Sequence, residues 1–265
     1  MKFEHIILEK KEAIATITLN RPEKLNPFNA QTEAEFAAAL QAVSADDTIR
    51  VLIITGAGRA FSAGGDMAQE DKLSHETSPE SVRKLVRHAS QTLIEQLHNL
   101  PQPTIAMVNG VCVGMAFDIA LACDMRMGSE NTRFKVGYTE IGRVPGIGGT
   151  WFLVRIIGLA RTAELLFTGG FLEAKDAERY GVLNKLVPAA NLKDETLALA
   201  QRIVSMPPLP IRYNKIHLYK MLHMDLPTAL DLLAFSQAAT TGSEDTMKAT
   251  TSFLERKKPA SKGGK

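Results

Sequence analysis

The sequence predicts an α/β fold in which a β/α core precedes a region built of helices. Between residues 51 and 185, short apolar runs alternate with segments whose apolar residues recur at helical spacing. Alternation of this kind is typical of parallel βαβ architecture. After Lys185 the pattern is helical only. We therefore expect a β/α core over residues 1–190 and a helical C-terminal region over residues 191–265.

The first part of the core is expected to hold a hairpin, a helix and a strand. Residues 3–8 and 13–19 alternate apolar and polar side chains across the polar segment EKKE, which predicts two paired strands. Alanine, phenylalanine and leucine then recur at helical spacing over residues 26–46. The apolar run at 51–55 predicts the strand that follows.

The middle of the chain predicts a loop, a long helix and a return to alternation. Residues 67–79 are polar and without a regular pattern, so we expect a loop that could cover a substrate. A helix is expected over residues 79–100, ending before the PQP segment. The elements expected after it are a strand from Thr104, a helix over 114–122, a strand over 125–128, a short strand near Phe134 and a helix from Thr150. The C-terminal helices are expected over residues 192–205, 210–222, 227–240 and 244–256.

Composition is that of a globular protein of enzyme size. The 265 residues are 45% hydrophobic and 23% charged, enough for one large α/β domain with a full core. The net charge of +2 is spread over interspersed signs, so we expect no nucleic-acid partner. No apolar run reaches the roughly 18 residues that span a bilayer, and the N-terminus shows no signal-peptide pattern. We expect a cytoplasmic protein without a membrane partner.

Cysteine and histidine usage gives no indication of a metal site. Cys112 and Cys123 both lie inside apolar runs, so we expect buried thiols. The six histidines show no short spacing typical of zinc ligands. We expect no bound metal.

Two glycine-centred loops carry the main indication of chemistry. FSAGGD (residues 61–66) follows the strand VLIITG, and VNGVCVGMAFD (residues 108–118) follows an apolar run that begins at Thr104. Both loops would lie at the carboxyl ends of neighbouring strands, where open α/β sheets place ligands. Small residues let backbone N–H groups approach a ligand closely. Two such groups converging on one oxygen form an oxyanion hole.

Together with other segments in the same order, these loops resemble the crotonase superfamily, the enoyl-CoA hydratase/isomerase family. The further segments are ITLNRPEKLNPFN (17–29), VPGIGGTWFLVRIIGLARTAELLFTG (144–169), AERYGVLNKLVP (177–188) and SFLERKKP (252–259). The resemblance implies a crotonase-like spiral of ββα units and a C-terminal trimerisation region. It also implies a homotrimer or a dimer of trimers, and a substrate carried as a coenzyme A thioester without a permanently bound cofactor.

The resemblance assigns the two oxyanion-hole donors and the first catalytic carboxylate. The donors are the N–H groups of Gly65 and Met115; Met115 stands where the family usually has glycine, but its N–H is independent of the side chain. Asp118 lies one helical turn beyond Met115 and so on the same helix face. It is the leading acid/base candidate. The alternative is an acidic residue that only stabilises the first turn of the helix.

The family's second carboxylate falls seven residues before Pro145, where this chain has Tyr138. A tyrosine with a pKa of about 10 donates a hydrogen bond but is a poor base at neutral pH. Glu140 follows two residues on. In an extended segment it would share a face with Tyr138 at about 6.6 Å. Glu140 either takes the role of the second acid or is solvated.

Further residues are implied in substrate binding. These are Lys24, Leu25, Ala63, Gly64, Asp66, Gly114, Phe253 and Lys257. The lysine often found two residues after the loop aspartate is missing, and Lys72 is a possible substitute. Asp124 is expected to be a structural turn residue.

The favoured function is enoyl-CoA hydration. Hydration normally divides proton transfer between two carboxylates. Because only Asp118 is placed by its position, a double-bond isomerase that uses one base is the alternative. The non-enzymatic alternatives are an acyl-CoA-binding or an RNA-binding protein.

Overall fold

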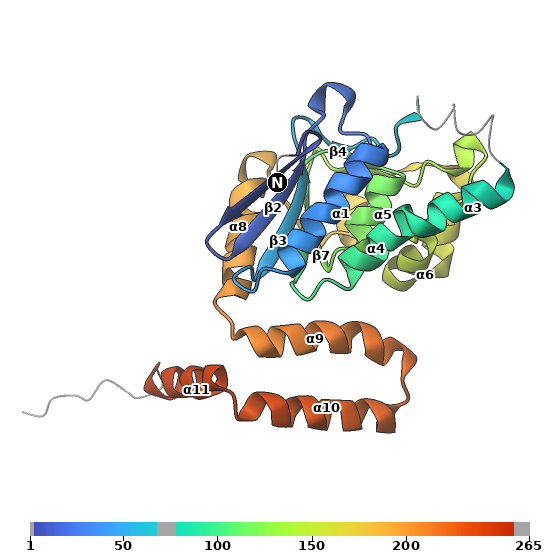
Figure 1. Ribbon diagram of the computed structural model, residues 1–265. Helices are drawn as coiled ribbons and strands as arrows, with labels where there is room; N and C mark the ends of the chain where they lie inside the picture. Colours follow the sequence, from blue (N-terminus) through green and yellow to red (C-terminus); the bar gives the residue numbers. More distant parts are fainter. Residues whose placement is uncertain (1–2, 68–77, 257–265) are drawn as a thin grey trace, which may run out of the picture. The chain divides into compact units, whose positions relative to one another are not determined.

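The computed structural model describes residues 3–67 and 78–256 (Figure 1). The chain divides into two compact units, Met1–Gln201 and Arg202–Lys265. The division lies inside α8 (Leu192–Val204), later than the boundary at 190 expected from the sequence. The reason is that α8 is attached to the first unit. Lys185 Nζ lies 2.6 Å from Glu195 Oε2, and Gln201 Nε2 donates to Glu12 Oε2 at 2.9 Å.

The first unit is built on a six-stranded sheet in the order β1-β2-β3-β5-β7-β10. β1 and β2 form the predicted antiparallel hairpin, and the remaining neighbours are parallel. All six residues of β3 are buried, as expected of a strand covered on both faces. The bounds are β1 (Ile6–Lys11), β2 (Ile14–Leu19), β3 (Val51–Gly56), β5 (Thr104–Val108), β7 (Met125–Ser129) and β10 (Lys185–Val187).

A second sheet has the order β4-β6-β8-β9. Its first three strands each follow a strand of the large sheet along the chain, β4 after β3, β6 after β5 and β8 after β7. The chain thus alternates between the two sheets, which confirms the predicted spiral of ββα units. The bounds are β4 (Ala60–Ser62), β6 (Val111–Val113), β8 (Arg133–Lys135) and β9 (Phe171–Glu173).

Helix α1 packs on β1 and β2 of the large sheet, and α4, α5 and α6 follow beside it (Figure 1). α4 contacts both α1 and α5, and α5 contacts α6. The Asn29 side chain caps α1 by accepting a hydrogen bond from the Thr32 amide at 2.8 Å. The bounds are α1 (Ala30–Ser44), α3 (Pro79–His88), α4 (Ser90–His98), α5 (Met115–Ala122), α6 (Gly149–Thr168) and α7 (Ala174–Tyr180).

Some details differ from the sequence-based expectations. The helix expected over 79–100 is two helices, because the backbone leaves helical geometry at Ala89 (φ −105°, ψ −82°). The hairpin turn lies at Glu12, with φ 54°, so β1 continues through most of EKKE. The loop expected over 67–79 lies mostly outside the described residues.

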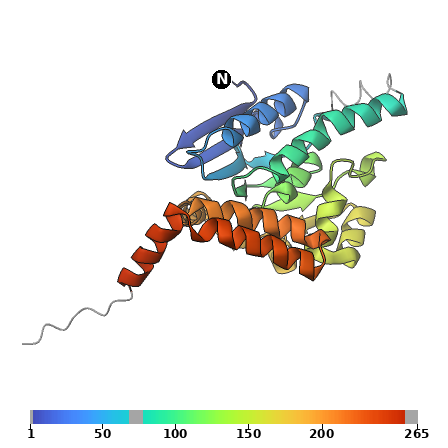
Figure 2. The same ribbon diagram turned by 60° about the horizontal axis from the view of Figure 1, so that its bottom comes forward.

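The second unit consists of the predicted helices, confirmed to within a few residues. Their bounds are α9 (Pro208–Lys220), α10 (Leu226–Thr241) and α11 (Glu244–Arg256). α9 and α10 lie side by side (Figure 2), and the His217 Nε2 and Ser236 Oγ atoms, 2.9 Å apart, connect them. Among the residues described, none of the helices combines the length and hydropathy that a bilayer crossing requires.

Candidate active site

The two glycine-centred loops lie directly against each other. β4 and β6 are parallel neighbours, so the loops leave the same edge of the second sheet. Gly64 has φ 95°, and a Cβ atom built on it would lie 2.7 Å from the Val113 carbonyl oxygen. Only glycine allows both the backbone angle and this close approach. The loops therefore lie together as expected, but at the ends of β4 and β6 of the second sheet and not directly after β3 and β5.

Segment 21–28 is hydrogen-bonded to the first glycine-centred loop, residues 61–66. The Ala63 amide donates to the Leu25 carbonyl at 2.8 Å, and the Phe28 amide donates to the Gly64 carbonyl at 2.7 Å. These bonds bring together Leu25, Ala63 and Gly64, three of the residues implied in substrate binding. Lys24 is exposed at the end of the 3-10 helix that precedes Leu25.

The amides of Gly65 and Met115 donate no hydrogen bond to any of the described residues. Met115 is the first residue of α5, where helix geometry leaves the N–H without a partner in the helix. The helix dipole adds partial positive charge there. The Met115 side chain is buried in the hydrophobic core.

Asp118 is a buried carboxylate in the first turn of α5, with 2% of its surface exposed. Tyr138 Oη donates to Asp118 Oδ2 at 2.9 Å. The other oxygen, Oδ1, lies against Gly149 at the start of α6, where a Cβ would overlap it. Burial raises the pKa of Asp118 to about 7, and the hydrogen bond from Tyr138 opposes this effect. A carboxyl group with a pKa near neutral is suited to accept and return a proton.

The expectation that Tyr138 and Glu140 share a face of an extended segment is wrong. The chain forms a 3-10 helix over Thr139–Ile141, which begins after Tyr138. Tyr138 then points to Asp118, with its ring next to Gly114. Glu140 instead forms an ion pair with Lys135 at 2.6 Å and is about half exposed.

The other predicted residues belong to the first loop, to the second unit or to the part of the chain that is not described. Asp66 pairs with Arg21 at 3.1 Å. Phe253 belongs to α11 of the second unit, and Lys72 and Lys257 lie outside the described residues. Asp124 accepts hydrogen bonds from the Thr104 amide and hydroxyl, which confirms its structural role.

Cys112 and Cys123 are buried free thiols, as expected. Within the described ranges no three potential ligand side chains of the His, Cys, Asp and Glu types gather as a metal site would require.

Two residues that shape the site are not predicted by the sequence. Gly149 contacts the Asp118 carboxylate, and Arg21 contacts the loop behind Gly65. Both lie in segments that carry the family resemblance, PGIGG and NRPEKLN, but neither contact follows from spacing along the chain. For the contact of Gly149 with Asp118, the indication that the sequence offers is the group of glycines at the start of a predicted helix.

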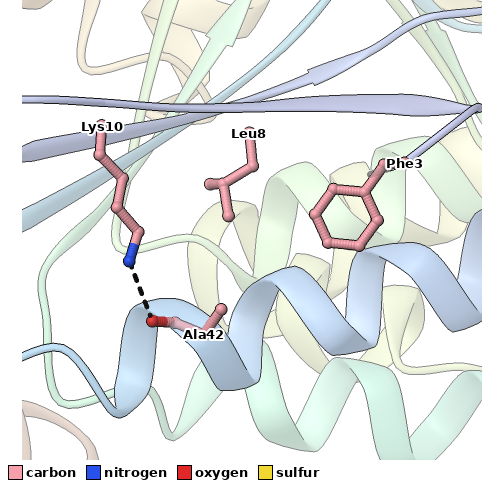
Figure 3. A pocket seen from close by; sticks show the side chains of 4 residues that line it. All are labelled: Phe3, Leu8, Lys10 and Ala42. Atoms are coloured by element: carbon pink, nitrogen blue, oxygen red, sulfur yellow. Dashed lines mark hydrogen bonds between the residues drawn. The ribbon is translucent and has the colours of Figure 1, made fainter. Parts of the chain in front are cut away.

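A cavity of about 420 Å³ lies elsewhere, between β1 and α1 (Figure 3). Phe3, Leu8, Lys10 and Ala42 line it. The charged group there, Lys10 Nζ, is paired with Asp46 at 2.7 Å. The residues that line this cavity therefore provide no set of convergent polar groups. The candidate active site remains at the two glycine-centred loops.

A spiral of ββα units that places a buried carboxylate beside two glycine loops defines a crotonase-fold enzyme. The chain belongs to the enoyl-CoA hydratase/isomerase family, whose model matches residues 9–264. It is 34% identical to the 1,2-epoxyphenylacetyl-CoA isomerase of Escherichia coli over 97% of both chains. It is 33% identical to the crotonyl-CoA hydratase of Syntrophomonas wolfei, over 97% of this chain and 98% of that one. The crystal structure of an enoyl-CoA hydratase from Bacillus anthracis superposes with a TM-score of 0.89 at 30% identity, covering 98% of this chain and 100% of the other.

Replacing Asp118 with asparagine is expected to stabilise the folded protein at pH 8. The folded carboxyl has a pKa of about 7, above the ordinary value of 3.8, so the folded state holds its proton more tightly than the unfolded state. Stability therefore falls as the pH rises from about 4 through 7. Each tenfold difference in proton affinity between the two states corresponds to roughly 1.4 kcal/mol. Asparagine keeps an acceptor for the Tyr138 hydroxyl and has no charge to bury.

Urea unfolding at pH 8 and at pH 4 measures this effect. The free energy of unfolding of Asp118→Asn is expected to exceed that of the wild type by a few kcal/mol at pH 8, and the difference should largely vanish at pH 4. The pH 4 measurement is the control for packing changes. An equal difference at both pH values would contradict the raised pKa.

Proposed function

We propose that this protein is an enoyl-CoA double-bond isomerase that uses Asp118 as a single base. The observation that supports this choice is the hydrogen bond from Tyr138 to Asp118. At the position where the family's hydratases have a second carboxylate, this chain has a hydroxyl donor. The nearby Glu140 is engaged by Lys135 and half exposed.

In the proposed reaction, ionised Asp118 accepts a proton from a carbon next to the double bond of the acyl chain. The electron pair moves toward the thioester oxygen, and an enolate conjugated with the double bond forms. Protonated Asp118 then returns the proton at the other end of the three-carbon unit. Atoms and charges balance without a second reactant. A pKa near 7 serves both steps, because the group must be a base in one and an acid in the other.

The N–H groups of Gly65 and Met115 are proposed to bind the thioester oxygen. Negative charge on that oxygen grows in the transition state, so donors placed there lower the barrier. The coenzyme A moiety is proposed to contact Lys24, Leu25 and Ala63. It is the carrier of the substrate, and no permanently bound cofactor is required.

Hydration is the second candidate, since relatives at 33% identity include a crotonyl-CoA hydratase and a short-chain-enoyl-CoA hydratase. In that case Asp118 would activate water and Tyr138 would have to assist proton delivery. Binding of acyl-CoA without turnover, or of RNA, has less support. A net charge of +2 provides little attraction for a phosphate backbone.

Incubation with a panel of enoyl-CoA thioesters in heavy-oxygen water separates these activities. The panel should contain pairs that differ only in double-bond position, and products are analysed by mass spectrometry. We expect rearrangement of the double bond without gain of the label. Incorporation of one heavy oxygen atom would show hydration and contradict the isomerase.

Two substitutions test the use of a single carboxylate. Asp118→Asn removes proton acceptance and keeps the shape, so turnover should fall by roughly 10² to 10⁴ with nearly unchanged affinity for the thioester. Glu140→Gln removes the other candidate acid and should leave turnover almost unchanged.

Steady-state kinetics on the best substrate, with calorimetric binding, measures both. A loss with Glu140→Gln comparable to that with Asp118→Asn would contradict the one-carboxylate mechanism. Full activity of Asp118→Asn would leave that residue with the role of stabilising the first helical turn.

We also propose a homotrimer or a dimer of trimers in the cytoplasm. The helices of the second unit carry large apolar side chains that are more than half exposed in one chain, as a surface that binds other copies would. They include Leu218, Leu222, Leu226, Leu230 and Phe235.

Light scattering at micromolar concentration should report at least three chains per particle. Changing Leu226 and Phe235 to serine together is expected to lower that mass, because both side chains are strongly exposed and neither is needed inside the chain. A monomer across the whole concentration range would contradict the proposal.

A further inference from the structure

Arg21 lies behind the loop that carries Gly65 and joins that loop to segment 21–28. Its guanidinium Nη1 donates to the Pro27 carbonyl oxygen and to Asp66 Oδ2, both at 3.1 Å. The two charged side chains are largely buried, with 12% of Arg21 and 16% of Asp66 exposed. A charge-assisted contact of low exposure is less weakened by water than a surface ion pair.

The Pro27 carbonyl belongs to the same peptide unit as the Phe28 N–H. That N–H donates to the Gly64 carbonyl at 2.7 Å, and the Gly64 carbonyl shares its peptide unit with the Gly65 N–H. Two peptide units thus connect the Arg21 guanidinium with the Gly65 amide. In a planar trans peptide the C=O and N–H bonds point in opposite directions. The bond from Phe28 therefore directs the Gly65 N–H away from segment 21–28.

A second hydrogen bond to Phe28 also fixes the orientation of the Gly65 amide. The Asp66 amide donates to the Phe28 carbonyl at 2.7 Å, so Gly65 is flanked by two bonds to Phe28. The Asp66 carboxylate in turn holds Arg21. Rotation of the Gly65 peptide would break the bond from Phe28.

The positive charge of Arg21 acts through the same two hydrogen-bonded peptide units. A cation next to a carbonyl oxygen draws electron density toward that oxygen and increases the partial positive charge on the N–H of the same peptide unit. Hydrogen-bonded groups in a low-dielectric environment polarise one another in this way. Arg21 would thus increase the donor strength of the Phe28 N–H and, through it, of the Gly65 N–H.

We propose that Arg21 is a positioning residue of the active site, which orients and polarises the Gly65 N–H through the Pro27–Phe28 and Gly64–Gly65 peptide units. This inference rests on the proposed function, because it assumes that Gly65 donates to the thioester oxygen. Arg21 itself does not touch the substrate. Its effect is on the charge that develops in the transition state, so it should appear in kcat more than in KM.

The test uses the full-length protein and hexa-2,4-dienoyl-CoA, a conjugated thioester whose absorbance moves to longer wavelength when its carbonyl is polarised. Arg21→Gln removes the charge and leaves an amide N–H donor on a side chain two bonds shorter, so both the orienting bond to Pro27 and the polarisation are weakened. We expect a smaller wavelength shift on binding, a fall in kcat of roughly tenfold and little change in KM. This fall in kcat is smaller than the roughly 10² to 10³ lost when a whole oxyanion-hole donor is removed. Arg21→Lys restores the charge and should regain part of both.

Arg133→Gln is the matched control. It removes the ion pair between Arg133 and Glu173, 2.7 Å long on the second sheet, and should change neither the spectrum nor kcat. Asp66→Asn gives an independent measurement, because it keeps an acceptor for Arg21 and removes the charge that offsets the guanidinium. The wavelength shift should be kept or increased in that variant.

The outcomes are distinct. A folded Arg21→Gln that binds the thioester with the wild-type wavelength shift and kcat would overturn the role of Arg21, as would a lost shift in Asp66→Asn. If Arg21→Gln does not fold, Arg21→Lys and Asp66→Asn still decide. Wild-type protein that binds no thioester would instead contradict the proposed function, and calorimetry detects that result before any variant is made.

Discussion

The site depends on the close approach of the Gly64 backbone to the Val113 carbonyl oxygen. The contact is possible because Gly64 has no Cβ and adopts φ 95°. It joins the end of β4 to the end of β6, and β6 leads directly into α5. The first N–H of α5 and the amide of Gly65 consequently lie at one edge, while Asp118 lies a helical turn further on. A side chain at Gly64 would separate the two loops and, with them, the donors from the carboxylate.

The parts of this arrangement that depend on local sequence could be predicted. Patterns a few residues long predict the ends of the longer strands and the C-terminal helices. The helical period likewise puts Asp118 on the same helix face as Met115. The three-residue strands β4, β6, β9 and β10 are too short to show a period, and β10 begins at Lys185, where only helices are expected. The placement of Tyr138 and Glu140 depends on a 3-10 turn that ends at Gly142 with φ 69°, and on an ion pair with Lys135. Spacing along the chain does not specify such contacts.

Burial of Asp118 connects stability with chemistry. The carboxyl is surrounded by the core, with the Tyr138 hydroxyl as a hydrogen-bond donor, and burial is the main cause of its raised pKa. Ionisation at neutral pH therefore costs folding free energy. The same cost makes the ionised form a stronger base than a solvated aspartate. Tyr138 moderates the effect: its hydrogen bond stabilises the carboxylate and keeps the pKa near the pH at which proton transfer in both directions is efficient.

The charged groups around the site differ in how deeply they are buried. This arrangement suits a reaction in which a single negative charge moves. Asp118 has a neutral partner, whereas Arg21 with Asp66 and Lys135 with Glu140 form pairs nearer the surface. In the proposed reaction, the negative charge leaves the carboxylate and appears on the thioester oxygen when a proton passes to Asp118. A fixed cation beside Asp118 would hold the charge there and oppose the transfer. The polarisation proposed for Arg21 would act at the oxygen end instead, and would favour the enolate without lowering the basicity of Asp118.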